Sequence, residues 1–179
     1  MQPTFLECDT VQLVPLSLSD TEQVRALHAD PFGNRCTALS ANCTLADAED
    51  LVRSALRDQQ DHGFAKWKAV SREGDFVGWA GFTPLSETSE ISLNYSLAPT
   101  VMTDETSLPE RLCNKLANWF FENTYYSHLV AAVRTDNRDM RDVVLRAGFK
   151  HRESQVIGGM QADLFQLLSP SIQSYLMTA

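Results

Sequence analysis

The chain has no long apolar run, no metal-binding cluster and a shortage of basic residues. No run of 18 consecutive apolar side chains occurs in its 179 residues, which excludes a membrane-spanning helix. The four histidines and four cysteines are scattered, without the spacing of metal ligands, so no metal site is predicted. Fifteen Lys and Arg against 23 Asp and Glu give a net charge of −8. This balance argues against general binding to nucleic acid or to anionic membranes.

The start of the chain indicates its compartment. Residues 1–4 (MQPT) carry neither the basic nor the apolar stretch of a secretory signal. The cysteines Cys8, Cys36, Cys43 and Cys113 are therefore expected to be reduced thiols of a cytoplasmic protein. A bridge between Cys36 and Cys43 is the alternative.

Length and hydrophobic pattern predict one α/β (α+β) domain spanning residues 1–179. Thr44 and Asp47 fit a capping box, and Gly148 follows a short helix where a positive φ is needed. We expect a central mixed, mostly antiparallel sheet of six to seven strands, flanked by about four helices. The expected order is strand 10–16, helix 20–29, a helix starting at 44, strands 64–70, 76–82 and 90–97, helix 107–122, strand 128–134, helix 137–147 and a hairpin of 151–156 and 161–167.

Three segments carry a resemblance to a known family. Residues 135–149 (TDNRDMRDVVLRAGF) contain an Asn, an apolar pair and a Gly-Phe at the spacing of that family, and residues 95–99 (YSLAP) match a strand that ends in a β-bulge. Residues 13–20 (LVPLSLSD) match its opening strand and helix. The chain therefore resembles the GNAT superfamily of N-acetyltransferases, especially the ribosomal-protein N-terminal acetyltransferase-like branch. The matching positions of the first segment are Asn137, Val143, Val144, Gly148 and Phe149.

The resemblance implies transfer of an acetyl (acyl) group from acetyl-CoA to a primary amine, by direct attack in a ternary complex. The acceptor would be a small molecule or a peptide, and backbone N–H groups near Leu97 would hold the oxyanion. Neither a membrane nor a nucleic acid is expected as a partner. A homodimer stays open, because dimers are common in the resembling branch.

The segment expected to bind the pyrophosphate departs from the family pattern. Residues 100–112 (TVMTDETSLPERL) contain no glycine, whereas glycines in such a loop let the backbone approach a phosphate closely. Asp104, Glu105 and Glu110 would repel the pyrophosphate from the helix N-terminus, or they simply cap the helix. The residues of this segment expected to contact the coenzyme are Met102, Thr103 and Ser107.

The expected catalytic groups also differ from the family pattern. Alignment on Tyr95 places Ser92 where the branch often has a catalytic Glu, and Glu90, on the same face, is the candidate base. A surface carboxylate is the alternative for Glu90, and packing is the alternative for Tyr95 as a proton donor. Met140 replaces a serine and has no proton to give. Asn137 is expected to contact the pantetheine arm, to cap its helix, or both.

Two tryptophans are candidates for the acceptor pocket. Trp67 and Trp79 lie on paired strands where family members often line that pocket, and the alternative is a role in the fold alone. Cys113 lies on the apolar stripe of its helix and is expected in the core.

Two other functions compete with acetyl-CoA-dependent transfer. The missing glycines, Ser92 and Met140 also fit a catalytically inactive GNAT-fold binding module. A third hypothesis is an acyltransferase that uses a carrier protein or a charged tRNA as donor. The RNA donor would need one basic patch, formed by Lys115, Arg138, Arg141, Arg146, Lys150 and Arg152.

Overall fold

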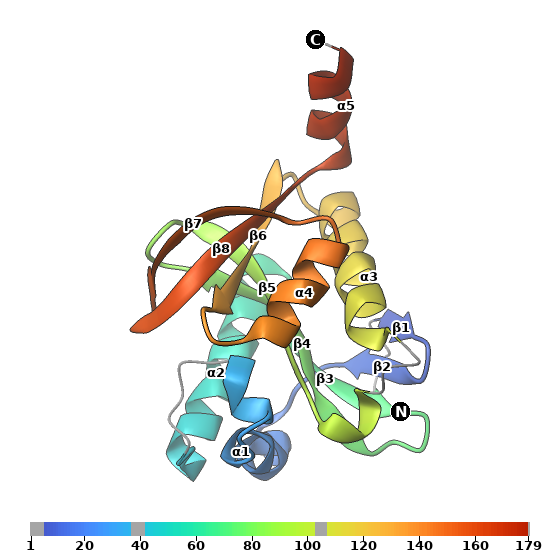
Figure 1. The fold of residues 1–179 in the computed structure, drawn as a ribbon. Coiled ribbons are helices and arrows are strands. Elements are labelled where there is room, and N and C mark those ends of the chain that lie inside the picture. Colours follow the sequence, from blue (N-terminus) through green and yellow to red (C-terminus); the bar gives the residue numbers. More distant parts are fainter. Residues whose placement is uncertain (1–5, 37–41, 103–106, 179) are drawn as a thin grey trace. The chain divides into compact units, whose positions relative to one another are not determined.

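The computed structural model describes residues 6–36, 42–102 and 107–178 (Figure 1). Within these residues there are eight strands and five α-helices, and the strands form one mixed sheet in the order β1-β2-β3-β4-β5-β6-β8-β7. Contacts divide the chain into two compact units, residues 1–83 with 94–108 and residues 84–93 with 109–179.

The first unit consists of antiparallel strands and two packed helices. Its elements are β1 (Leu6–Cys8), β2 (Val11–Val14), α1 (Thr21–Ala29), α2 (Leu45–His62), β3 (Lys66–Ser71), most of β4 (Phe76–Leu85), the second half of β5 (Glu90–Leu97) and three short 3-10 helices, η1 (Leu18–Asp20), η2 (Gly33–Cys36) and η3 (Pro99–Val101).

Local sequence signals determine where the helices of this unit begin. The predicted capping box is confirmed, because Thr44 Oγ1 accepts the N–H of Asp47 at 3.1 Å and Asp47 Oδ2 accepts the N–H of Thr44 at 2.8 Å. Asp20, just before α1, accepts the N–H of Ser17 at 2.8 Å and the ammonium of Lys68 at 2.7 Å. The helices bury one apolar stripe each. The core of the unit contains Leu16, Val24, Cys43, Ala48, Val52, Ala55 and Ala65.

The second unit is built around a long antiparallel hairpin. Strand β8 (Met160–Leu168) pairs with β6 (His128–Arg134) from His128↔Leu168 to Arg134↔Ala162, and with β7 (Lys150–Ile157) on its other side. The unit also contains the end of β4, the first half of β5, α3 (Leu108–Asn123), α4 (Arg138–Arg146) and α5 (Pro170–Thr178). Its core contains Leu85, Val130, Ala132, Ile157, Ala162 and Leu164.

Most of the expected order is confirmed, and two elements were not predicted. Strands β5 and β6 have the expected bounds, and Gly148 has the expected positive φ, +93°. The sheet has slightly more strands than expected because β1, only three residues long, is too short to show an alternating pattern. Helix α5 was missed because no polar-apolar period distinguishes its nine residues.

The cysteines whose side chains are described are buried. The thiol of Cys43 is free, so Cys43 does not form the alternative bridge to Cys36. The core position expected for Cys113 is confirmed, since its side chain is fully enclosed.

Candidate functional site

In the first unit, the end of β5 is held close to β4 by a glycine. A Cβ atom on Gly78, whose φ is +139°, would lie 2.1 Å from the carbonyl oxygen of Ser96 and 2.9 Å from Cα of Leu97. The N–H of Ala98 donates to the carbonyl of Val77 at 2.8 Å. Only glycine therefore allows this approach, at the point where the oxyanion-binding backbone was expected.

The coenzyme candidates near this point lie in different surroundings. Tyr95 and Leu97 are buried, and period-2 alternation places them on one face of β5. Met102 follows η3 and is half-buried, with its N–H donating to the carbonyl of Pro99 at 3.1 Å. Ser107 is exposed, with a φ of +41°. Thr103, together with Asp104 and Glu105, lies outside the described residues.

Trp67 and Trp79 are both buried in the first unit, and they lie on opposite faces of the sheet. Trp67 pairs with Ala80 and Lys68 pairs with Trp79, so consecutive residues of β3 point each tryptophan to a different face. The exposed fractions are 3% for Trp67 and 1% for Trp79. The two side chains therefore do not line one common pocket wall.

Trp79 belongs to a buried polar group that the sequence did not reveal. Its indole N–H donates to Nε2 of His28 at 2.9 Å, and the ammonium of Lys66 lies 5.8 Å from its ring centre. Burial lowers the pKa of His28 to about 4 and the pKa of Lys66 to about 8. Burial also raises the pKa of Asp58, whose Oδ2 has no hydrogen-bond partner among the described residues. The sequence contains only a weak signal for this group. His28 lies on the apolar stripe of its helix, and Lys66 precedes Trp67 in a strand of alternating polar and apolar residues.

In the second unit, Glu90 is the centre of an ion-pair network. Arg152 donates to both of its oxygens, at 2.6 and 2.9 Å, and Nε2 of His128 lies 2.6 Å from Oε1. The hydrogen bonds from Arg152, opposed by burial and aided by His128, lower the pKa of Glu90 to about 2. A carboxylate with so low a pKa accepts a proton poorly at neutral pH. These contacts favour an ion-paired role over that of a general base.

Ser92 supports the pairing of β5 with β6. It lies opposite Val130 in this parallel pair, and its Oγ accepts the backbone N–H of Ala132 at 3.1 Å. The side chain is fully buried. Its hydroxyl oxygen thus satisfies a strand N–H that would otherwise be buried without an acceptor.

Asn137 caps α4, as one of its two expected roles requires. Its Oδ1 accepts the N–H of Met140 at 3.1 Å, and its side chain is buried. Met140, which replaces the branch's serine, is also buried. The cap uses one acceptor position of the Asn137 amide, and the expected contact with pantetheine stays a prediction.

Arg146 and Arg152, which belong to the expected RNA-binding patch, form ion pairs with carboxylates. Arg146 donates to Glu110 at 3.1 Å, which joins α4 to the first turn of α3. Arg152 also contacts Glu153, at 2.9 Å, besides Glu90. Such ion pairs reduce the positive potential available to a phosphate backbone.

Within residues 6–36, 42–102 and 107–178, no three His, Cys, Asp or Glu side chains are grouped so that they could hold a metal ion. No helix in that part of the chain has both the length and the apolar character to cross a membrane.

Solved structures share this fold at low sequence identity. A putative GnaT-family acetyltransferase from Bordetella pertussis has a TM-score of 0.75 and 16% identity, covering 90% of this chain and 97% of its own. An acetyltransferase from Agrobacterium tumefaciens str. C58 has a TM-score of 0.77 and 18% identity, covering 93% and 95%. RimL, a ribosomal L7/L12 alpha-N-protein acetyltransferase in complex with coenzyme A, has a TM-score of 0.74 and 12% identity, covering 93% and 98%.

The sequence comparison gives the family. No curated protein matches the chain significantly. The model of the acetyltransferase (GNAT) domain matches residues 10–150, a range that runs from the start of β2 to the start of β7 and includes both halves of β5, α3 and Asn137. This protein belongs to the GNAT acetyltransferase family.

Proposed function

We propose that residues 1–179 act as one catalytic domain that transfers an acetyl group from acetyl-CoA to a primary amine of a small molecule or a peptide. The observation that carries this proposal is the family match over residues 10–150. The likeness to RimL, solved with coenzyme A, supports coenzyme A as the carrier. The buried free thiol of Cys43 supports the cytoplasm as the place of action.

The reaction is a direct transfer. The neutral amine nitrogen attacks the thioester carbonyl, the C–N bond forms and the C–S bond breaks. Coenzyme A leaves as a thiol, and the proton lost by the amine balances the one that the thiolate gains. The backbone of β5 at Leu97, fixed against β4 through Gly78, would hold the oxyanion, since such donors act without a particular side chain.

Among side chains, the proposal assigns binding of the pantetheine arm to Asn137 and proton donation to Tyr95. Tyr95 lies two residues before Leu97 on the same face of β5, and a phenol can protonate a departing thiolate. Because the carboxylate of Glu90 is tied to Arg152, direct attack does not depend on Glu90 as the base. An unchanged kcat in Tyr95→Phe would remove Tyr95 from the reaction.

Titration calorimetry with acetyl-CoA, desulfo-CoA and pantetheine tests the proposed donor. Saturable binding of acetyl-CoA, with weaker binding of pantetheine, is the expected result. Thiol release would then be followed with N-terminal peptides and with small amines, to identify the acceptor class. Absence of heat with all three ligands contradicts acetyl-CoA as the donor.

A second function, a binding module without transferase activity, is favoured by two observations. Met140 fills a buried position where the branch has a proton-donating serine, and Glu90 is locked in an ion pair. This candidate requires that no acyl-CoA binds.

Pantetheine binding as tightly as acetyl-CoA would instead favour a carrier protein as donor, because such a carrier lacks the adenine pyrophosphate.

A further inference from the structure

The start of β6 carries a chain of polar contacts that ends in an exposed serine. Ser127 Oγ lies 3.2 Å from Nδ1 of His128, and Nε2 of His128 lies 2.6 Å from Oε1 of Glu90. Arg152 donates to both oxygens of that carboxylate, at 2.6 and 2.9 Å. A hydroxyl, an imidazole and a carboxylate thus follow one another, with a guanidinium holding the carboxylate.

The proton positions in this chain follow from the charge of the carboxylate. The hydrogen bonds from Arg152 lower the pKa of Glu90 to about 2, so at neutral pH its oxygens only accept hydrogen bonds. Nε2 of His128 therefore carries a proton and donates to Glu90. In the neutral imidazole Nδ1 is then the acceptor, and the hydroxyl of Ser127 donates to it. In this tautomer the imidazole is able to take a proton from the serine.

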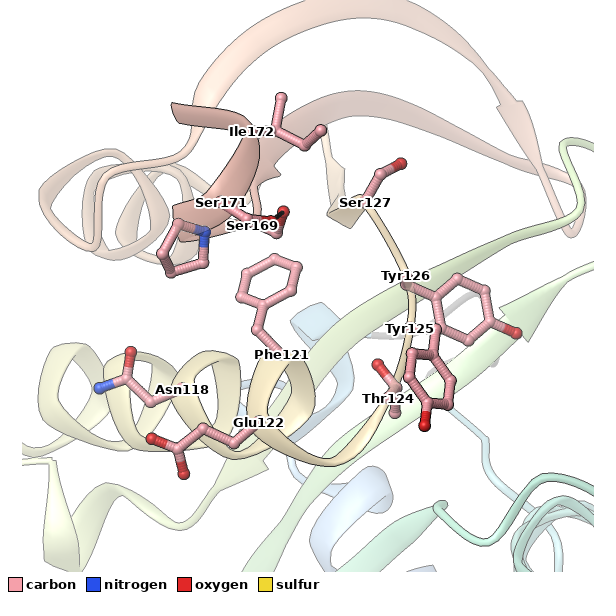
Figure 2. Close-up of a pocket in the computed structure, with 11 residues that line it drawn as sticks. Asn118, Phe121, Glu122, Thr124, Tyr125, Tyr126, Ser127, Ser169, Ser171 and Ile172 are labelled. Atoms are coloured by element: carbon pink, nitrogen blue, oxygen red, sulfur yellow. Dashed lines mark hydrogen bonds between the residues drawn. The ribbon is translucent and has the colours of Figure 1, made fainter. Parts of the chain in front are cut away.

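Ser127 also lines a hollow of about 460 Å³, which we call the α3–α5 hollow. Its volume lies within the roughly 300–1,000 Å³ of small-molecule sites. The walls come from the end of α3, the segment before β6 and the start of α5. Figure 2 shows Phe121 of α3 pointing toward Ser169 and Ser171, with Ser127 and Ile172 at the edge of the same hollow.

The first turn of α5 brings backbone donors to this hollow. The N–H of Ser169 donates to the carbonyl of Ser127 at 2.8 Å, which holds the start of α5 beside Ser127. Ser171 and Ile172 are the second and third residues of this nine-residue helix, where N–H groups have no acceptor within the helix. Both residues line the α3–α5 hollow. N–H groups at a helix N-terminus stabilise negative charge close to them.

A nucleophile, a base in contact with it and a third group that orients the base are the arrangement by which serine performs covalent catalysis. We propose that the α3–α5 hollow is a second catalytic site, separate from acetyl transfer, which hydrolyses small neutral carboxylic esters. Ser127 is the nucleophile, His128 is the general base, and Glu90 orients the imidazole. The N–H groups of Ser171 and Ile172 hold the oxyanion.

The reaction has two steps that balance. Ser127 Oγ attacks the ester carbonyl while its proton passes to Nδ1 of His128, the bond from the carbonyl carbon to the alcohol oxygen breaks, and His128 returns the proton to the departing alcohol. Water then attacks the acyl-serine and gives one proton to His128. The acid leaves as Ser127 regains that proton. The sum is an ester and water converted to an acid and an alcohol.

The lining favours a neutral ester over an acyl-CoA. Phe121 and Ile172 offer apolar contacts to a short acyl chain. The charged side chain among the described lining residues is Glu122, and a carboxylate repels the phosphates of a coenzyme A ester. Esters of short-chain acids with an uncharged alcohol therefore fit this hollow best.

The site lies at the other end of β6 from the residue expected to hold the pantetheine arm. Ser127 comes directly before β6, whereas Asn137 follows it. The seven residues of the strand separate the two by about 20 Å. The proposal also gives the ion-paired Glu90 a role in which it does not act as a base.

Hydrolysis of para-nitrophenyl acetate by the full chain tests the proposal. A burst of nitrophenolate and then a slower steady phase are expected, with an acetyl group on Ser127 detected by tandem mass spectrometry after acid quench. Ser127→Ala is expected to abolish both signals, and His128→Gln to slow the burst by about 100-fold or more. Ser174→Ala is the matched control, since it removes a hydroxyl of α5 that does not line the hollow, and the burst is expected to be unchanged.

Two further readouts separate this site from folding and from acetyl transfer. Circular dichroism reports the folding of each variant, and thiol release from acetyl-CoA with an amine acceptor is expected to be the same in Ser127→Ala as in the wild type. A wild-type chain without a burst overturns the proposal, as does a burst that persists in Ser127→Ala with acetyl groups on lysines. Loss of acetyl transfer together with hydrolysis in a natively folded Ser127→Ala would overturn the separateness of the two sites.

Discussion

Trp79 of β4 donates its indole N–H to Nε2 of His28 at 2.9 Å, a contact that joins the sheet to α1 across 51 residues of sequence. Because Nε2 accepts this bond, the proton of the neutral imidazole is on Nδ1. Both side chains are buried, so neither can exchange its partner for bulk water. The bond therefore orients the imidazole and joins α1 to β4, while burial lowers the pKa of His28 to about 4.

The first prediction concerns this bond. His28→Leu leaves the buried indole N–H without an acceptor and is expected to lower the free energy of unfolding by about 1–3 kcal/mol. His28→Gln keeps an acceptor of similar reach and is expected to cost less. Urea unfolding of the two variants measures the difference. Equal losses would show that the indole bond adds nothing beyond packing.

The second prediction is a pH dependence of stability. The pKa of His28 is about 4 in the folded chain, below the ordinary value of about 6.5, so the unfolded chain binds more protons between these values. The contribution of neutral His28 to the free energy of unfolding is then fully present above pH 6.5 and is lost as the pH falls toward 4. His28→Gln is expected to flatten the stability curve in this window. A variant curve as steep as that of the wild type would contradict the assignment.

The third prediction separates two roles of Glu90. Its pKa of about 2 lies below the ordinary value, so its contribution to stability is present above about pH 4.5 and is lost as the pH falls toward 2. Glu90→Gln and Arg152→Met are expected to lower stability by similar amounts, on the order of 1–3 kcal/mol, with kcat changed less than tenfold. A loss of kcat in Glu90→Gln alone would identify Glu90 as the base.

The fourth prediction concerns the cap of α4. Asn137→Ala removes the acceptor for the N–H of Met140 and is expected to cost about 1 kcal/mol. Asn137→Ser keeps a capping oxygen and restores most of this stability. If Asn137 also binds the pantetheine arm, both variants raise the KM for acetyl-CoA, because serine lacks the amide. A KM for acetyl-CoA in Asn137→Ser equal to that of the wild type would show that Asn137 only caps α4.

The fifth prediction concerns the approach of β4 to β5. Gly78→Ala places a Cβ atom 2.1 Å from the backbone oxygen of Ser96, which the strands can accommodate only by moving apart. Gly74→Ala is the control, since Gly74 also has a positive φ, +90°, but open space around it. Thermal unfolding is expected to show a much lower Tm for Gly78→Ala. Equal Tm values for the two variants would show that the positive φ alone, and not the contact with Ser96, lowers the stability.

The sequence predicted the regular elements because their signals are local. The capping pattern of Thr44 and Asp47, and the alternation in residues 90–97, each lie within one segment, and both agree with the structure. The family pattern around Asn137 has the same local character, and it lies within the residues that the family model matches.

The contacts of the candidate site were harder to predict because they join distant residues. Glu90 and Arg152 are 62 positions apart, and nothing near either residue marks the other as its partner. Ser92 was proposed as a catalytic residue by alignment on Tyr95, and its bond to Ala132 depends on the register between β5 and β6. The buried state of His28 likewise depends on Trp79, which only the folded chain brings near it.

Strand β7 forms one edge of the sheet, and its exposed residues begin with Lys150, His151, Arg152 and Glu153. An incoming strand would have to strip water from these side chains before it could pair. Among the described residues, the opposite edge, β1, contains three. Both edges of the sheet therefore disfavour the addition of further strands. Concentrated solutions of the native protein are not expected to form amyloid fibrils.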